Sequence, residues 1–258
     1  MSNEVAKVTP KTSLGLKQVE KEELALAGLS EGDFKEILDQ NLGGAEIRTW
    51  DFPRYTIPSG GGTSWQPAQQ GQEERKEITG VVIGSRPIRG YYIEKYGSGD
   101  KGPPDCASLD CISGFGILAE GEEPKARNCL GCPKAQFGSD VKEDGTEGRG
   151  QACGQNVLLF VLEPDAILPT VVKLPPTSLK PWKLYGINLM SARLAVSRVV
   201  TKLTLRRTQN ADSVSYSEVV PTAVAQLSPD TVGLIDGMIR MLRSVVVDNR
   251  EVAQKAAT

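Results

Sequence analysis

Residues 196–207 read VSRVVTKLTLRR, in which charged or polar residues alternate with apolar ones. Successive side chains of a strand point to opposite faces, so this alternation predicts a β-strand with one apolar face in a core. The two faces carry Arg198, Lys202 and Arg206 against Val199, Leu203 and Leu205. Residues 214–220 follow after a polar turn and predict the second strand of a hairpin.

Further strands are predicted upstream, where short apolar runs recur between turn residues. They cover residues 47–57, 78–84, 90–95, 156–162 and 167–174, with a turn at Ser85-Arg86-Pro87 joining the second and third. Helices are predicted after the cap at Ser30, from Pro175 to about Leu194, and after the cap at Ser228. About seven strands and three helices predict a mainly β fold, and we expect an OB-type β-barrel with a zinc-binding insertion and a C-terminal helix.

The chain divides into three parts around this barrel. Residues 1–45 are expected to form an N-terminal extension with a short helix, and residues 46–225 the barrel. Residues 226–258 are expected to form the C-terminal helix and a short tail. The insertion, residues 99–153, interrupts the barrel between its early and late strands.

All five cysteines lie within the insertion, and the chain has no histidine. Cys129 and Cys132 have the CxxC spacing at which two thiolates bind one zinc ion from a single turn. Cys106 and Cys153 are the expected further ligands and Cys111 is spare, although an exchange of Cys106 for Cys111 stays open. Four thiolates leave no position for water, so we expect one structural zinc ion. Ordinary buried thiols or a disulfide are the alternative.

The whole-chain charge gives no basic signature, because the 258 residues carry a formal net charge of −2. The first residues lack the apolar run of a secretory signal, and the longest apolar run, residues 157–162, is too short to cross a bilayer. We therefore expect a cytoplasmic protein that does not enter a membrane. Thiols stay reduced in the cytoplasm, which favours metal ligation over disulfides.

One segment departs from this neutrality. Residues 166–211 contain eight Lys or Arg residues and no Asp or Glu. Cations four residues apart on a strand lie about 13 Å apart, a spacing that suits the phosphates of an extended single strand, and interleaved aromatic rings can stack on bases. A solvated cationic face is the alternative. The expected nucleic-acid contacts are Arg86, Arg89, Tyr91, Tyr92, Lys180, Trp182, Lys183, Arg198, Lys202 and Arg206.

Four stretches resemble one family of proteins. They are FPRYTIPSGGGTSW (52–65), PDCAS (104–108), CLGCPKAQFGS (129–139) and LPPTSLK (174–180). The family consists of zinc-containing OB-fold proteins of phages and mobile elements, assigned to single-stranded DNA binding. The resemblance spans about residues 50–210, and it implies that Cys106, Cys129, Cys132 and Cys153 are the zinc ligands. At the position of Cys111 the family more often has glycine.

One feature departs from single-strand binders of phages and bacteria. Many of them end in an acidic tail that recruits partners, whereas residues 249–255 of this chain read NREVAQK. Recruitment through such a tail is therefore not expected.

The resulting hypothesis is a non-enzymatic protein that binds single-stranded DNA during replication or recombination of a phage or mobile element. Its expected partners are the DNA strand and replication or recombination proteins, while homo-oligomerisation and the choice between DNA and RNA stay open. One alternative is a protein-interaction or assembly module that docks through the zinc loop. Another is a metal-dependent nuclease with carboxylates at Asp140, Glu143, Asp144 and Glu147.

Overall fold

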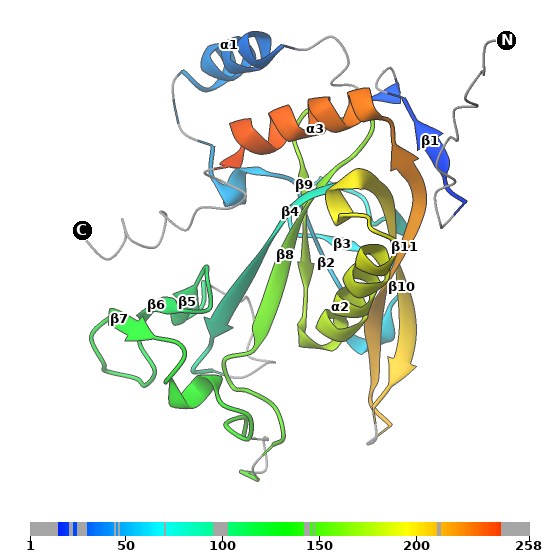
Figure 1. Ribbon diagram of the computed structural model, residues 1–258. Helices are drawn as coiled ribbons and strands as arrows, with labels where there is room; N and C mark the ends of the chain where they lie inside the picture. Colours follow the sequence, from blue (N-terminus) through cyan, green and yellow to red (C-terminus); the bar gives the residue numbers. More distant parts are fainter. Residues whose placement is uncertain are drawn as a thin grey trace, which may run out of the picture.

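The protein folds around one curled, mainly antiparallel sheet (Figure 1). The computed structural model describes residues 15–20, 23–24, 30–43, 45, 47–69, 71–94, 103–141, 145–146, 148–210 and 213–243. The strands are β1 (Lys17–Val19), β2 (Arg54–Thr56), β3 (Gln66–Pro67), β4 (Glu77–Tyr91), β5 (Cys106–Ser108), β6 (Ser113–Gly116), β7 (Lys125–Asn128), β8 (Gln155–Leu162), β9 (Thr170–Leu174), β10 (Val199–Gln209) and β11 (Ser215–Leu227). The helices are α1 (Glu31–Leu42), α2 (Pro176–Ser191) and α3 (Pro229–Met241).

The strand order is β1-β11-β10-β4-β8-β9-β2-β3. Its centre is β4, which pairs with β10 through its first residues and with β8 from Val81 onward. The register shifts between Val82 and Gly84, and an irregularity of this kind bends a strand and increases its twist. Because β4 changes partners along its length, the sheet curls into a half-barrel.

Residues 77–91 form one continuous strand, so the turn expected at Ser85-Arg86-Pro87 is wrong. Proline removes one backbone donor and is tolerated where a strand has an open side. On one side of β4, Pro87 pairs with Val157 of β8. On the other side, the pairing of β4 with β10 stops at Val81 and its pairing with β5 starts at Arg89, so that Pro87 lies between the two ladders. The missing N–H of Pro87 therefore interrupts no second ladder.

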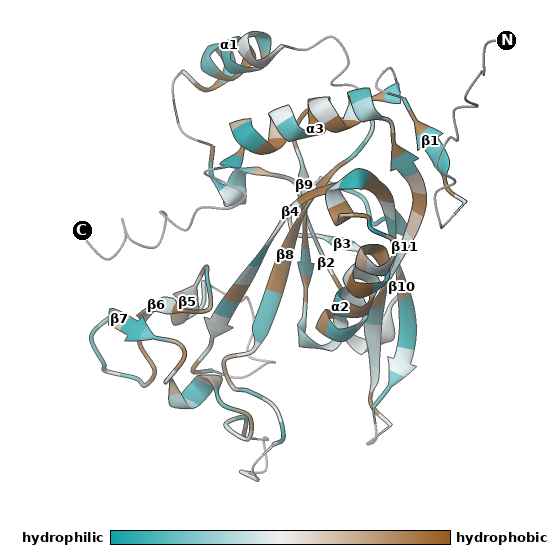
Figure 2. Cartoon of the chain, viewed as in Figure 1, coloured by the Kyte–Doolittle hydropathy of each residue, from teal (hydrophilic) through white to brown (hydrophobic). Residues whose placement is uncertain are grey.

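Both faces of the half-barrel are covered by apolar side chains. The concave face gathers Tyr55, Trp65, Ile78, Leu159, Leu203 and Val219, and α2 packs against it through Leu179 and Trp182. The opposite face carries Val81, Phe160 and Val200, and α3 covers it with Ile235 and Met238. Figure 2 shows the matching apolar segments along β8 and α2. Because each face is covered by its own helix, the side chains that point to opposite faces of a strand are buried in two different cores.

The helix ends form as the cap residues indicate. The Ser30 hydroxyl accepts from the Asp33 N–H at 3.1 Å, and Gly43 ends α1 in the left-handed conformation. At the start of α3 the Ser228 hydroxyl accepts from the Thr231 N–H at 3.3 Å, and the Ser228 N–H donates to the Val19 carbonyl at 3.0 Å. The second bond fixes the end of β1 to the start of α3. The described residues before 46 and after 225 thus include side chains, such as Phe34 and Ile235, that pack in the same core as the sheet.

The prediction of a mainly β fold with added helices is confirmed, including the β10–β11 hairpin. The remaining boundaries differ more. Residues 47–57 form a single turn of 3₁₀-helix, Thr49–Asp51, followed by the short β2, and β11 extends to Leu227. Among the described residues, no helix has the length and apolarity needed to cross a membrane.

Trp65 holds the two ends of the half-barrel together, and its loss gives a first prediction. The indole is fully buried and donates to the Leu203 carbonyl on β10 at 3.1 Å. Trp65→Phe keeps an aromatic ring but leaves that buried carbonyl unpaired, so we expect a loss of about 1–3 kcal/mol in the free energy of unfolding. Urea denaturation measures it. Trp50→Phe is the matched control, because Trp50 is about half exposed, and an equal loss in both variants contradicts the proposed role.

Candidate metal centre and nucleic-acid surface

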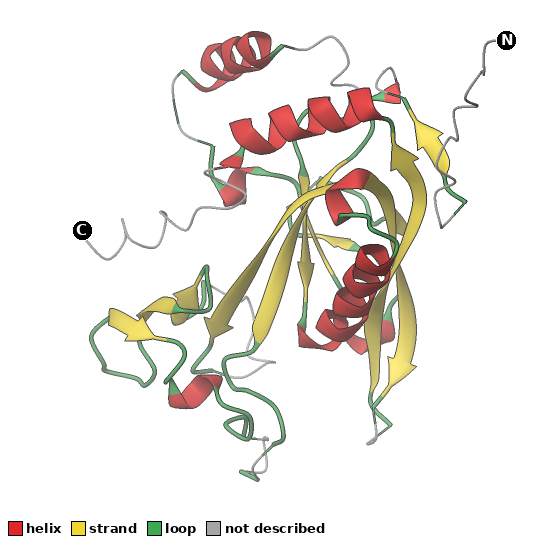
Figure 3. Ribbon diagram, in the orientation of Figure 1, coloured by secondary structure: helices red, strands yellow, loops and turns green. Residues whose placement is uncertain are grey.

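The cysteine insertion, residues 99–153, leaves the sheet at the end of β4 and returns at the start of β8. Within it, β5, β6 and β7 form a small antiparallel ladder that continues from the last residues of β4. Figure 3 shows these short strands joined by long loops, at the end of the molecule away from α3. The insertion contributes nothing to the two large cores, so its order depends on local contacts.

The four expected zinc ligands come from three separate places in the insertion. Cys106 is the first residue of β5, and Cys129 directly follows β7. The Cys132 N–H reaches the Cys129 carbonyl at 3.4 Å, which closes the CxxC turn. The Cys153 N–H donates to the Lys134 carbonyl at 2.7 Å, so the strand entering β8 lies beside the knuckle.

Two sulfurs meet at Gly114 of β6. A Cβ on that residue would stand 3.1 Å from the Sγ of Cys129 and 3.7 Å from the Sγ of Cys106. Any larger side chain would therefore occupy the space between the thiols. Glycine at this position keeps that space open.

Electrostatic coupling extends the cluster to all four thiols. The pKa of Cys153 is raised to about 12, chiefly by burial; Arg89 opposes this rise, and the charges of Cys106, Cys129 and Cys132 add to it. Burial also raises the pKa values of Cys106 and Cys129, to which Cys132 adds its charge. Every pair among the four is thus within electrostatic reach. The described cysteines form no disulfide, and no three Cys, Asp or Glu side chains within the described ranges are arranged to hold a metal ion as they stand.

Cys111 differs from the other four in backbone and surroundings. Its φ is +60°, in the left-handed region that favours glycine. The turn is held by the Asp110 carboxylate, which accepts from the Ile112 N–H at 2.8 Å and the Ser113 N–H at 2.7 Å. Burial raises the pKa of Cys111 to about 11, and among the other cysteines only Cys129 contributes to that rise. Because glycine would fit this backbone conformation better than cysteine, we do not place Cys111 among the expected zinc ligands.

Cys111→Gly therefore provides a second prediction. Removing the side chain relieves the left-handed strain, so we expect an unchanged zinc content and a free energy of unfolding that is equal or higher by up to about 1 kcal/mol. Elemental analysis and chemical denaturation measure the two quantities. Loss of bound zinc in this variant would show that Cys111 is a ligand.

The two arginines of β4 that were expected to contact DNA, Arg86 and Arg89, bind groups of the protein instead. Arg86 is 2% exposed, donates to the Thr49 hydroxyl and lies over the Phe160 ring at 5.7 Å. Arg89 donates to the Cys153 carbonyl at 2.6 Å, next to the thiol cluster. Of the neighbouring tyrosines, Tyr91 is buried beneath the Lys134 ammonium, while Tyr92 is exposed. Of these four residues, only Tyr92 lies at the surface.

The three cations expected to contact DNA from this segment, Arg198 just before β10 and Lys202 and Arg206 within it, are each paired with an acid from another element. Arg198 makes two bonds to the Asp236 carboxylate of α3, at 2.8 and 3.1 Å. The Lys202 Nζ lies 3.2 Å from Glu77 of β4, and the Arg206 Nη2 lies 2.6 Å from Glu218 of β11. The face that lacks acids in sequence is thus supplied with acids by the sheet and α3. A phosphate would have to compete with these pairs.

The outward face of α2 has the opposite character. Lys180 and Lys183 are exposed and, like Arg193 just beyond the helix, have no ion-pair partner in the described part of the chain. The same face carries the exposed side chains of Leu184, Ile187 and Met190. Trp182 faces inward, half-buried, with its ring 5.6 Å from that of Tyr185. We call this outward face, from Lys180 to Met190, the α2 surface.

The α2 surface begins beside the cysteine insertion. A Cβ on Gly154, directly after Cys153, would stand 3.3 Å from the Cγ of Pro176, the first residue of α2. The Ser178 hydroxyl accepts from the Val219 N–H at 3.0 Å, which fixes the same turn of the helix to β11. Lys180 and Lys183 thus project from a rigid segment next to the insertion.

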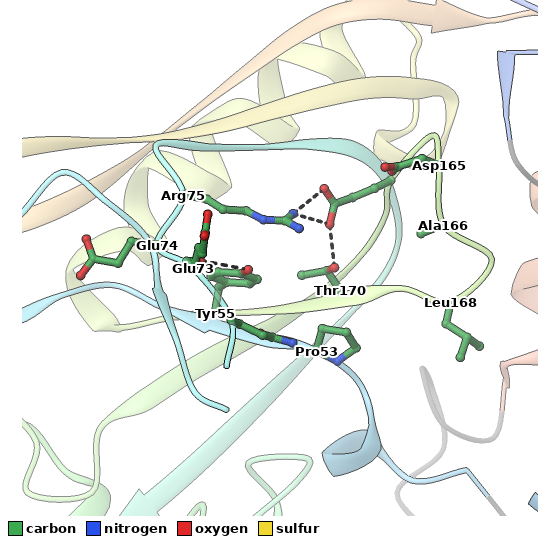
Figure 4. Close-up of a pocket in the computed structure, with 11 residues that line it drawn as sticks. Pro53, Tyr55, Glu73, Glu74, Arg75, Asp165, Ala166, Leu168 and Thr170 are labelled. Atoms are coloured by element: carbon green, nitrogen blue, oxygen red, sulfur yellow. Dashed lines mark hydrogen bonds and ion pairs between the residues drawn. The ribbon is translucent and has the colours of Figure 1, made fainter. Parts of the chain in front are cut away.

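A pocket of about 420 Å³ lies elsewhere, between the segment before β4 and the β8–β9 turn (Figure 4). Its wall carries four carboxylates, from Glu73, Glu74, Glu163 and Asp165. Its single guanidinium, Arg75, is bound to Glu163 through contacts of 2.7 and 2.9 Å. This excess of negative charge disfavours a phosphate backbone.

The sequence predictions overlooked Phe137, Leu130 and Ile112, exposed apolar side chains of the insertion. Phe137 is an isolated aromatic residue in a polar stretch close to Cys129 and Cys132. This isolation is the sequence feature that could have identified it as an exposed contact residue. Of the acidic positions considered for a nuclease, Asp140 is half-buried, while Glu143, Asp144 and Glu147 lie outside the described residues. Comparisons with protein-family models, with curated proteins and with solved structures found no match.

Proposed function

We propose that this protein is a non-enzymatic, zinc-stabilised binder of single-stranded DNA that acts in replication or recombination. The observation that carries the proposal is the α2 surface. Lys180 and Lys183 stand there without acidic partners, beside exposed apolar side chains and next to the cysteine insertion. Unpaired cations supply salt-dependent affinity for phosphates, and apolar surface nearby suits unstacked bases.

The connectivity of the sheet supports an OB-type barrel as the scaffold. The succession β4-β8-β9-α2-β10-β11 gives five strands with a helix between the third and fourth, and β4 pairs with both β8 and β10. This order of strands and helix supports our proposal of a five-stranded, partly open barrel of the OB type. Its first and second strands are then β4 and β8, and the cysteine insertion replaces the loop between them. In OB-folds this loop and the one between the last two strands contact oligonucleotides.

One departure from the OB barrel determines where we expect the single-stranded DNA to lie. OB barrels also bind through their second and third strands, but here Phe160 of β8 and Val171 of β9 are buried in the same apolar core as Ile235 and Met238 of α3. We therefore propose that the single-stranded DNA lies on α2 and on the two barrel loops, the cysteine insertion and the loop between β10 and β11. Lys180 and Lys183 are retained as contacts, and Arg198, Lys202 and Arg206 are secondary because each must leave a carboxylate.

A zinc ion is the proposed stabiliser of the insertion. Cys106 and Cys129 meet at Gly114, Cys132 closes the turn that begins at Cys129, and the N–H of Cys153 is bonded to the Lys134 carbonyl beyond that turn. The charges of Arg127 and Arg89 act on the thiols of Cys106 and Cys153, respectively. Four thiolates in so small a space would repel one another, and a divalent ion neutralises that repulsion while holding the segments together. With four sulfur ligands its contribution is structural.

A gel-shift competition tests the proposed function. A labelled oligo-dT strand should be retained by the protein in the presence of excess unlabelled duplex of the same length. Competition as effective by duplex as by single strand would point to generic charge attraction and oppose the proposal.

The apolar side chains Leu184, Ile187 and Met190 favour a second candidate, a docking module that binds an apolar partner segment through α2. The two candidates differ in their response to Lys180→Gln/Lys183→Gln. These changes should weaken DNA binding but leave an apolar protein contact largely intact.

A further inference from the structure

Three apolar side chains stand out from the surface of the cysteine insertion. Phe137 is 81% exposed, Leu130 is 69% exposed and Ile112 is 54% exposed. Leu130 lies inside the CxxC knuckle and Phe137 follows it closely. Exposing such side chains on the segment with the least core is costly, so a contact that covers them is expected.

Hydrogen bonds bring the three positions together although they are distant in sequence. The Cys129 N–H donates to the Ile112 carbonyl at 2.8 Å. The Gln136 side-chain amide donates to the Leu130 carbonyl and to the Cys132 carbonyl, both at 3.3 Å. Ile112, Leu130 and Phe137 therefore adjoin one turn, which we call the insertion tip.

A cation adjoins the insertion tip. The Gly138 N–H donates to the Gly150 carbonyl at 2.8 Å, so Phe137 and Arg149 precede the two bonded residues on adjoining segments. Arg149 is exposed, and within the described ranges it has no ion-pair partner. The segment that carries Phe137 thus lies beside the segment that carries Arg149, and the two run antiparallel, because the Gly148 N–H donates to the Asp140 carbonyl at 2.6 Å.

The size of the tip distinguishes between occupants. A stable protein–protein contact covers about 800 Å² on each partner and involves about 20–30 residues of each. Three side chains cannot provide that area by themselves, but one aromatic ring suffices for one base, and a nearby cation suits its phosphate. The position of the tip in the loop between the first two barrel strands points to the same occupant.

We propose that the insertion tip is a stacking site for an unpaired nucleobase, with Phe137 against the base and Arg149 at the adjacent phosphate. Leu130 and Ile112 are the other exposed apolar residues at this turn. This inference rests on the proposed function. It names the residue that distinguishes single-stranded from duplex DNA, because a base that is paired and stacked inside a duplex is not accessible to the Phe137 ring. The thiol cluster then has a functional consequence: it fixes the position of Phe137.

Two strands of equal length test the inference, oligo-dT and an abasic strand that keeps the phosphates but lacks bases. Phe137→Ala should weaken oligo-dT binding by about 5- to 100-fold and leave abasic binding unchanged, and Phe137→Trp should restore it. Arg149→Gln should weaken binding to both strands and lower the slope of log K against log salt by about 0.7. Leu42→Ala, an exposed apolar position on α1, is the matched control.

The outcomes separate this inference from the function on which it rests. Wild-type protein that binds neither strand removes the proposed function. Wild-type protein that binds oligo-dT, together with unchanged binding by Phe137→Ala, leaves the function intact and overturns the stacking site. If Phe137→Ala alters only the sedimentation coefficient, the tip is a protein contact and the inference is wrong.

Discussion

Cys132→Ser is expected to reduce the zinc content from about one ion per chain to none and to unfold the cysteine insertion. A structural zinc site contributes about 10–16 kcal/mol to folding in small zinc domains, far more than the few local contacts of this segment. The two large cores contain no cysteine, so they should stay folded. Elemental analysis measures the metal, and amide hydrogen exchange measures protection separately in residues 103–153 and in β8, β9 and α3.

Cys111→Ser is the matched control, because it removes a thiol of the same insertion that we do not place among the ligands. It should keep both the zinc and the protection. Equal protection of the insertion in Cys132→Ser and wild-type protein would contradict the stabilising role of the metal. Loss of protection throughout the chain would instead mean that the insertion and the sheet fold as one unit.

Lys180→Glu/Lys183→Glu is expected to weaken oligo-dT binding by about 10- to 100-fold at low salt. Each change removes a phosphate contact and adds a repelling charge, and the loss should shrink as salt rises. Both side chains are exposed and unpaired among the described residues, so folding should be unaffected. Fluorescence anisotropy measures the affinity. Lys35→Glu, an exposed lysine on α1, controls for net charge, and an equal loss there would remove the α2 surface from the account.

The cations of β10 need a different design. Reversal at Arg206 or Lys202 would place two carboxylates together, opposite Glu218 or Glu77, so lost binding could reflect a damaged sheet. Exchanging the pair, as Arg206→Glu/Glu218→Arg, keeps the contact. We expect that variant to bind within about threefold of wild-type protein, because a neutralised pair contributes little to the field at the phosphate.

Local patterns predicted the parts of the fold that depend on neighbouring residues. The period of two at residues 199–205 identified β10, and Ser30 and Ser228 marked the starts of α1 and α3. Pro87 was misleading because a turn and an open strand side both tolerate proline, and only the ladder partners of β4 distinguish them. The grouping of the cysteines was visible in the sequence, whereas the left-handed φ of Cys111 was not.

The candidate surface was less predictable because charge pairing is a property of the folded chain. The acid-free segment predicted a free cationic face, but Asp236, Glu77 and Glu218 reach it from elements distant in sequence. Arg86 was an expected contact and is buried against Phe160. Lys180 and Lys183 are exposed as expected, and no acidic side chain of the described ranges pairs with them. In the sequence Phe137 was marked only by its isolation in a polar stretch, and its exposure in the folded chain then identified it as a candidate contact.

Anisotropy titration of the wild-type, zinc-loaded protein with labelled oligo-dT at two salt concentrations tests the central claim most directly. Binding at micromolar or lower protein concentration that weakens as salt rises is the result predicted for phosphate contacts supported by stacking. Absence of binding at the lower salt concentration would contradict it.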